Sequence, residues 1–270
     1  VFPLHVWLPN AYTYAPNAVT VFLAACSTKV SLYLLLRFDF FVFQGNLTGH
    51  DIQFTYFLMP LAILAILVAS SVALFEQNVK RLLAYSSIAQ IGYILLGASL
   101  VTITGLTAST VHLFNHALAK GALFLAVGCL ATQCMGLRLS DIGGVAKRMP
   151  WTAGALVVAG FSLIGIPGTA GFISKWYLIA AALEQGWLGI VLIAVLVISS
   201  LMAVAYIWRI VESIYFAEPS TDLSGLREAP LTMLVVTWLA VLANIYFGLV
   251  PEVPLALSSS AAETQLSHLL

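Results

Sequence analysis

The chain has 270 residues with a formal net charge of zero, and 61% of them are hydrophobic while only 8% are charged. Soluble domains carry about 25% charged residues, so eleven basic and eleven acidic side chains cannot cover a water-soluble globule of this length. The composition therefore excludes a soluble protein, and the zero net charge excludes nucleic acid as the expected partner.

The N-terminal segment contains Pro3, Pro9 and Pro16 and is interpreted as the second half of a broken helix. Because Val1 opens the chain in the middle of this pattern and no signal peptide follows, we interpret the chain as a piece of a longer protein. Seven mostly apolar stretches come next, and each is close to the length of about 20 residues that spans a bilayer, or longer. They comprise residues 17–36, 56–75, 82–100, 107–131, 151–183, 188–208 and 231–250.

The short connections and continuous apolar runs predict an all-α, polytopic transmembrane helical bundle. The alternating pattern of a membrane β-strand is missing from these runs, which disfavours a β-barrel. We expect one membrane domain over residues 1–250, truncated at its N-terminus, and a tail over residues 251–270.

The fifth stretch is too long for one straight crossing, and Gly165, Pro167 and Gly168 interrupt it, with Gly171 just beyond. Proline removes a backbone donor and glycine relaxes a helix, so we expect a break near the middle of the membrane. A pair of broken helices is typical of transporters built from inverted repeats. Close packing of a neighbouring helix is the alternative use of the glycines.

The basic residues between the predicted spans are distributed unequally. One side of the membrane collects Lys80, Arg81, Arg138, Lys147, Arg148, Arg209 and Arg227, and the other side has Arg37 alone. The positive-inside rule predicts that the first side is cytoplasmic and that the tail from Pro251 lies on the non-cytoplasmic side.

The remaining basic residues, Lys29, Lys120 and Lys175, fall inside predicted spans. An ammonium group at the centre of a bilayer costs about 3 kcal/mol on insertion scales, so such residues are functional candidates. Lysines held away from water can exchange protons near neutral pH. The alternative for Lys29 is that its side chain extends to the membrane surface.

Two histidines precede Lys120 at helical spacing, which places His112, His116 and Lys120 in a stripe along one helix face. A line of proton acceptors inside a membrane predicts a proton path. A zinc site is disfavoured because no third ligand is evident and Lys120 would repel the ion. Haem is disfavoured because both histidines lie on the same helix, while histidines that serve only as packed hydrogen-bond donors remain an alternative.

No nucleotide-binding loop, dinucleotide fingerprint or cysteine cluster is present in the sequence. We therefore expect no cofactor, no metal and no catalytic site in this chain. Any driving energy is expected to come from an ion gradient or from partner subunits.

Four motifs, at residues 3–11, 80–93, 112–120 and 165–175, give the chain a resemblance to a known family. The chain resembles the proton-translocating antiporter family, which includes Mrp-type monovalent cation/proton antiporter subunits and the antiporter-like membrane subunits of complex I and of membrane-bound hydrogenases. The resemblance covers residues 1 to about 215. Asn10 stands where the family motif has Asp, which leaves an ion pair at that position without support.

The resemblance implies a fold of fourteen helices with two inverted five-helix repeats, of which this chain is similar to the second. It implies that Lys29 is the central lysine of the eighth helix and that Lys175 is the exit lysine of the second broken helix. His112, His116 and Lys120 are implied to link the two lysines.

Our main functional expectation is a proton-translocating subunit of a multisubunit Na⁺ or K⁺/proton antiporter, most similar to the D-type subunits of Mrp antiporters. The alternative is an antiporter-like proton-pumping subunit of NADH:quinone oxidoreductase (complex I) or of a membrane-bound hydrogenase, in which other subunits carry the enzyme chemistry. A purely structural scaffold is the third possibility. The expected partners are other membrane subunits, the lipid bilayer, protons and Na⁺ or K⁺, and the expected location is the bacterial plasma (inner) membrane.

Overall fold

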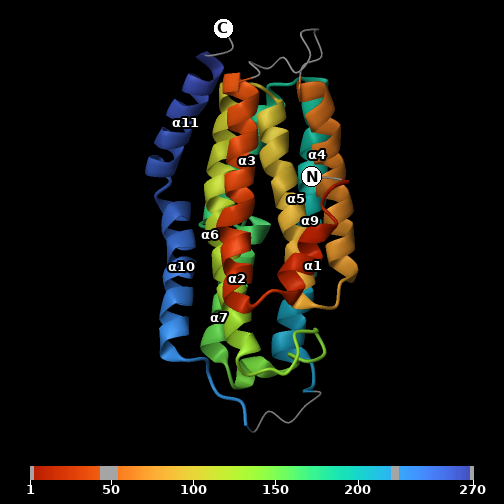
Figure 1. Cartoon of the computed structure of the whole chain (residues 1–270), viewed down its shortest axis with the longest axis vertical. Coiled ribbons are helices and arrows are strands. Elements are labelled where there is room, and N and C mark those ends of the chain that lie inside the picture. The colour runs from red at the N-terminus through yellow and green to blue at the C-terminus, as the bar shows by residue number, and fades with distance from the viewer. Residues whose placement is uncertain (1–2, 43–53, 220–224, 268–270) are drawn as a thin grey trace.

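The computed structural model describes residues 3–42, 54–219 and 225–267. Figure 1 shows helices that lie side by side along the long axis of the molecule. Within these ranges all regular structure is helical, apart from one isolated bridge between Asn78 and Arg138. The predicted all-α transmembrane helical bundle is confirmed.

Eleven α-helices are present in the described part of the chain. They are α1 (Trp7–Tyr14), α2 (Asn17–Phe22), α3 (Thr28–Arg37), α4 (Phe54–Phe75), α5 (Val79–Ser99), α6 (Ile103–Ala131), α7 (Pro150–Ile164), α8 (Ala170–Leu183), α9 (Trp187–Phe216), α10 (Leu231–Leu249) and α11 (Glu252–Ser267). Two π-helical segments, η1 (Leu23–Ser27) and η2 (Phe38–Val42), adjoin α3, and a short 3₁₀ segment, η3 (Val145–Lys147), precedes α7.

Six helical segments are long and apolar enough to cross a membrane in the described part of the chain. They are Asn17–Val42, Phe57–Phe75, Val79–Ser99, Ile103–Ala131, Trp187–Phe216 and Leu231–Leu249. The shorter pair α7 and α8 corresponds to the fifth predicted stretch, so the six segments and this pair account for all seven predictions.

Several helices begin before the apolar run that predicted them, because polar side chains cap their first turns. Asn78 accepts a hydrogen bond from the backbone N–H of Arg81 at 3.2 Å, and α5 therefore begins at Val79 rather than at residue 82. Thr102 accepts from the N–H of Gly105 at 3.0 Å, and α6 begins at Ile103 rather than at residue 107.

The fifth stretch is broken between α7 and α8. Gly165 and Gly168 adopt φ values of 90° and 87°, a left-handed conformation that favours glycine. Gly171 has a different role, because a Cβ atom there would collide with the backbone carbonyl of Ser162. Gly165 and Gly168 therefore allow the chain to turn, with Pro167 between them, and Gly171 allows close packing.

Helix α5 lies at the centre of the bundle, and nearly all of its residues are buried. Its neighbours include α1, α4, α6, α8 and α9. The helix positions polar side chains such as Ser86 and Tyr93 inside the protein rather than toward lipid.

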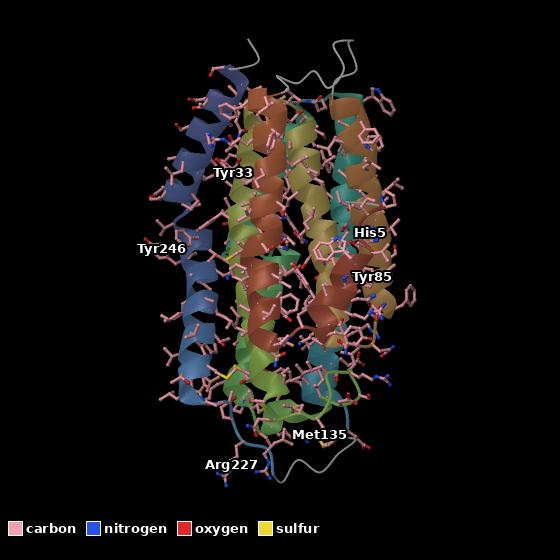
Figure 2. All side chains as sticks on the ribbon, in the orientation of Figure 1. His5, Tyr33, Tyr85, Met135, Arg227 and Tyr246 are labelled. Atoms are coloured by element: carbon pink, nitrogen blue, oxygen red, sulfur yellow. The ribbon has the colours of Figure 1, made fainter. Side chains whose placement is uncertain are left out.

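The connections α4–α5, α6–α7 and α9–α10 lie toward the same end of the molecule (Figure 1). Figure 2 shows Arg227 and Met135 at this end and Tyr33 toward the opposite one. The seven basic residues assigned to one side therefore lie toward one end, and Arg37, at the end of α3, lies toward the other. Which end faces the cytoplasm stays a prediction.

Residues 252–267 of the predicted tail form α11, which packs along α6 beyond the end of α10 (Figure 1). Its residues Ser258, Ala262 and Gln265 are buried. Residues 268–270 lie outside the described residues, and the non-cytoplasmic location of the tail stays a prediction.

Candidate functional site

Lys29 lies at the start of α3, immediately after the π-helical segment η1, and only 4% of its surface is exposed. Its Nζ donates a hydrogen bond to the backbone carbonyl of Ala24 inside η1. Short π-helical turns inside α-helices are frequent at functional sites. Because the ammonium group is held inside the protein, the alternative of a side chain that extends to the membrane surface does not describe Lys29.

Lys120 lies on α6 and is fully buried. Its Nζ donates to the backbone carbonyl of Leu83 at 2.7 Å and to the hydroxyl of Ser86. Both acceptors belong to α5, so Lys120 ties the two central helices together. A buried ammonium group requires such acceptors, because unpaired burial of a charge is very costly.

His112 and His116 lie one turn apart on α6, with their rings stacked at a centroid separation of 6.0 Å and an interplanar angle of 8°. His112 Nδ1 pairs with the hydroxyl of Ser174 on α8 at 2.8 Å. His112 Nε2 and both ring nitrogens of His116 are buried and have no hydrogen-bond partner among the described residues. Buried polar atoms nearly always have partners, so packing as a hydrogen-bond donor does not account for His116.

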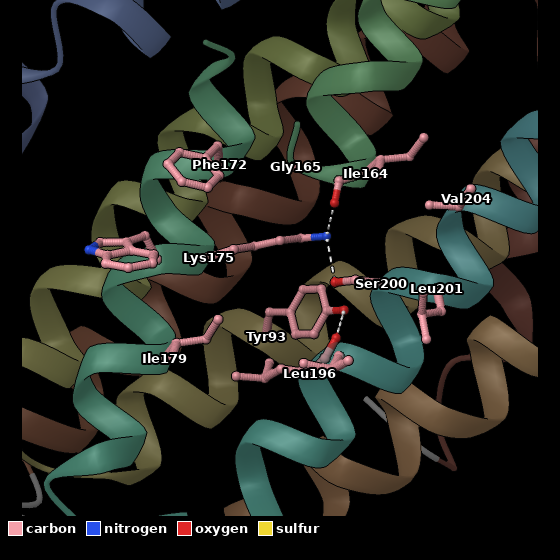
Figure 3. A pocket seen from close by; sticks show the side chains of 12 residues that line it. Tyr93, Ile164, Gly165, Phe172, Lys175, Ile179, Leu196, Ser200, Leu201 and Val204 are labelled. Carbon is pink, nitrogen blue, oxygen red and sulfur yellow. Dashed lines mark hydrogen bonds between the residues drawn. The ribbon is translucent and has the colours of Figure 1, made fainter. Parts of the chain in front are cut away.

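Lys175 lies on α8, just after the break. Its Nζ donates to the backbone carbonyls of Leu163 and Ile164 at 3.2 and 2.7 Å and to the hydroxyl of Ser200 at 3.2 Å. The two carbonyls are free because α7 ends there, and a helix C-terminus favours a cation. Figure 3 shows Lys175 reaching across to Ile164 and Ser200, above the ring of Tyr93.

Polar side chains of neighbouring helices hold the broken segment. Asn115 of α6 donates to the carbonyl of Ala170 at 2.6 Å, and Ser162 of α7 pairs with Asn244 of α10 at 2.9 Å. Non-helical backbone at membrane depth is tolerated where the protein satisfies its polar groups in this way.

The titratable groups lie on α3, α6 and α8. Lys29 and Lys120 both interact electrostatically with His116, while Lys29 and Lys175 both interact with His112. Lys29 also interacts with Lys120. The three groups on α6 are therefore within electrostatic reach of Lys29 on α3, and His112 is also within reach of Lys175 on α8. The structure thus brings together all five lysines and histidines that the sequence singled out.

Three neutral side chains at the site were not predicted from the sequence as site residues: Tyr93, Ser174 and Ser200. Ser174 orients His112, Ser200 accepts from Lys175, and Tyr93 lies against both. Polar hydrogen-bonding groups inside apolar helices were the available signal, since such groups need a partner away from water. In the described ranges no group of three or more His, Cys, Asp or Glu residues could hold a metal ion.

A family model described as NADH:quinone oxidoreductase/Mrp antiporter, TM, matches residues 1–203. The chain belongs to this family. The chain is therefore an integral membrane protein, in agreement with its six apolar spanning segments.

Two similar proteins are NADH-quinone oxidoreductase subunits. Subunit N of Desulforudis audaxviator (strain MP104C) is 44% identical over 216 residues, which cover 80% of this chain and 42% of that protein. Subunit N 2 of Syntrophobacter fumaroxidans (strain DSM 10017 / MPOB) is 32% identical over 269 residues, which cover 98% of this chain and 55% of that protein. The chain spans about half the length of these relatives.

A similar solved structure is that of the Mrp complex from Dietzia sp. DQ12-45-1b, with a TM-score of 0.88 and 27% identity. The match covers 98% of this chain and 56% of that one. The resemblance to antiporter-like membrane subunits is thus confirmed. The expectation of a D-type Mrp subunit is not supported, because the two relatives above are subunit N proteins, and this finding favours the complex I alternative.

Proposed function

We propose that this chain is part of a proton-pumping, antiporter-like membrane subunit of an NADH:quinone oxidoreductase, of the subunit N type. The observation that carries the proposal is the series of buried lysine and histidine side chains on α3, α6 and α8. The two subunit N relatives support the choice of complex.

In this proposal a proton enters the series at Lys29, crosses the linking groups of α6, which are Lys120 and the histidine pair, and reaches Lys175. The stacked histidines are too far apart for direct transfer at a centroid separation of 6.0 Å. Water can bridge them, because the unpartnered nitrogens of His112 and His116 offer it hydrogen-bond partners. At the last step the proton is held on Lys175 by the carbonyl of Ile164 and the hydroxyl of Ser200.

Redox chemistry is not assigned to this chain. NADH oxidation and quinone reduction belong to other subunits of the proposed complex, and neighbouring membrane subunits transmit the energy. The bilayer of a bacterial plasma membrane surrounds the chain, as is expected for the bacterial respiratory relatives. The end with seven basic residues is assigned to the cytoplasm.

A second candidate is a subunit of a Na⁺ or K⁺/proton antiporter, which the structural match to the Mrp complex favours. The same lysines and histidines would then carry protons against a counterflow of the cation. Proton uptake driven by a Na⁺ or K⁺ gradient, without NADH, identifies this candidate.

The proposal is tested with Lys120→Ala and Lys175→Ala in the full-length subunit within its assembled complex. NADH-driven proton uptake by inside-out vesicles is expected to fall at least about tenfold in each variant. Lys147→Ala is the matched control, because Lys147 is exposed in the α6–α7 connection.

Complex assembly is measured on native gels in parallel. Wild-type proton uptake in both Lys120→Ala and Lys175→Ala, with normal assembly, would contradict the proposal and favour a structural scaffold.

A further inference from the structure

Tyr93 lies between the histidine pair and Lys175. It is fully buried on α5, and its ring is almost perpendicular to that of His112, with centroids 5.6 Å apart and an interplanar angle of 82°. The Nζ of Lys175 lies over the same ring, 5.2 Å from its centroid. One side chain therefore contacts the groups on both sides of the last proposed proton transfer. Figure 3 shows its ring beside Lys175.

The hydroxyl of Tyr93 anchors the ring on the far side. It donates to the backbone carbonyl of Leu196 on α9 at 3.5 Å, which is a long and weak hydrogen bond. The serines Ser199 and Ser200 of α9 lie near the same hydroxyl. The ring itself is packed in a cluster of buried apolar side chains, so its position does not depend on the hydroxyl alone.

The face of an aromatic ring carries negative charge density and attracts an ammonium group, most strongly where water is excluded. The attraction exists only while Lys175 is protonated. The carbonyls of Leu163 and Ile164 hold the Nζ in place, and the ring adds a preference for its charged form.

We propose that Tyr93 is a positioning residue that favours the protonated form of Lys175 and thereby directs the proton from His112 to Lys175. This inference rests on the proposed function. It assigns the effect to the aromatic ring rather than to the hydroxyl.

The other groups near Lys175 do not supply the attraction that the ring of Tyr93 exerts on the ammonium group. His112 on α6 is a titratable neighbour that interacts with Lys175. Helix α7 contributes carbonyls and has no titratable side chain. Helix α9 contributes the hydroxyl of Ser200 and carries the buried Tyr206, which interacts with Tyr93. Helix α10 has only Tyr246, which is 57% exposed.

The test compares Tyr93→Phe, which keeps the ring, with Tyr93→Leu, which removes it. Both are made in the full-length subunit within the assembled complex, and NADH-driven proton uptake is measured from pH 6 to pH 9, a window of about three units around neutrality. We expect Tyr93→Phe to remain within about twofold of wild type. We expect Tyr93→Leu to lose about tenfold at alkaline pH, with the alkaline limb of the profile displaced by about one unit to lower pH.

The matched control is Phe124→Leu, which also removes a buried ring. Phe124 lies on α6 in a perpendicular contact with Tyr12, at 5.4 Å and 86°. It is twelve residues from His112 on the same helix, which corresponds to about 18 Å along the helix axis. Its pH profile is expected to keep the wild-type shape. If Tyr93→Leu fails to assemble, Tyr93→Met supplies a flexible side chain of suitable volume for the same measurement.

Three results would overturn the inference: a wild-type profile for the ring-deleted variant, an equal loss in Tyr93→Phe, or a loss of the same factor at every pH. The Lys175→Ala variant separates this inference from the proposed function. If Lys175→Ala abolishes uptake while Tyr93→Leu behaves as wild type, only the role of Tyr93 is wrong; if Lys175→Ala pumps normally, the proton path itself is wrong.

Discussion

Lys120 and Lys175 are both buried ammonium groups, but their acceptors belong to different kinds of helix. Lys120 donates to α5, an uninterrupted central helix, through Leu83 and Ser86. Lys175 donates to the carbonyls of Leu163 and Ile164, which are free only because α7 is broken. An uninterrupted helix holds its acceptor in place, whereas a helix end supplies free acceptors that a small change at the break can redirect.

The sites of Lys120 and Lys175 also differ in their position along the helix bundle and in their surroundings. Ser86, beside Lys120, and Tyr93, beside Lys175, are seven residues apart on α5, which corresponds to about 10 Å along the helix axis. A pocket of about 280 Å³ between α8 and α9 reaches Lys175 and is lined by exposed residues such as Trp176 and Leu201. Lys120 therefore lies nearer the basic end and is enclosed, whereas Lys175 lies at the break beside a pocket.

The largest effect on these two sites is expected from a disturbance of the helix break itself. We expect Gly171→Ala to reduce assembled complex severely, because its Cβ would collide with the backbone carbonyl of Ser162 and backbone cannot move aside as a side chain can. The measurement is the amount of intact complex on native gels. Gly154→Ala is the control, because its Cβ would make ordinary contacts of 3.7 and 3.9 Å with Trp238; equal assembly of the two variants would show that the break tolerates displacement.

A smaller effect is expected when one hydroxyl acceptor is removed from each lysine. The loss of proton uptake can then be compared directly between the Lys120 and Lys175 sites. We expect Ser86→Ala to lower proton uptake about tenfold, because Lys120 then keeps a single acceptor in a fully enclosed site. We expect Ser200→Ala to stay within about threefold, because Lys175 keeps two carbonyl acceptors beside the pocket. Uptake measured in inside-out vesicles checks both, and a larger loss in Ser200→Ala would reverse the assignment.

The smallest effect is expected from variants that report only which end is cytoplasmic. Lys147→Cys and Arg37→Cys are made after replacement of the native cysteines Cys26, Cys129 and Cys134. A membrane-impermeant maleimide is expected to label Lys147→Cys in inside-out vesicles and Arg37→Cys in right-side-out vesicles, with proton uptake unchanged. The opposite labelling would place Lys120 nearer the non-cytoplasmic side and invert the direction of the proposed path.

The helices themselves were predictable because a bilayer demands long apolar segments. Even the broken fifth stretch was visible, since Gly165 and Pro167 interrupt an apolar run that is too long for one crossing. The predictions were wrong about where helices begin. Helices α5 and α6 begin a few residues before the predicted apolar runs, because Asn78 and Thr102 cap first turns that contain polar residues. The predicted tail includes α11, which packs on α6. This helix was not predicted, because its sequence contains many polar side chains.

The candidate residues of the proton path could be selected from the sequence alone. A charge inside an apolar segment is so costly that Lys29, Lys120 and Lys175 stood out without any structure, and the spacing from His112 to Lys120 placed those groups on one face of one helix. The apolar runs likewise required that the chain cross a membrane, and the motifs related it to the antiporter-like subunits.

The contacts between helices, in contrast, required the tertiary structure. The pairing of Lys120 with Ser86, of His112 with Ser174, and of Lys175 with the end of α7 depends on how each helix is rotated and at what height it packs. Helical periodicity relates residues within one helix and carries no information about the neighbour. Tyr93 is the clearest case, because an uncharged ring in an apolar helix acquires a role only when folding places it under one ammonium group and against one imidazole.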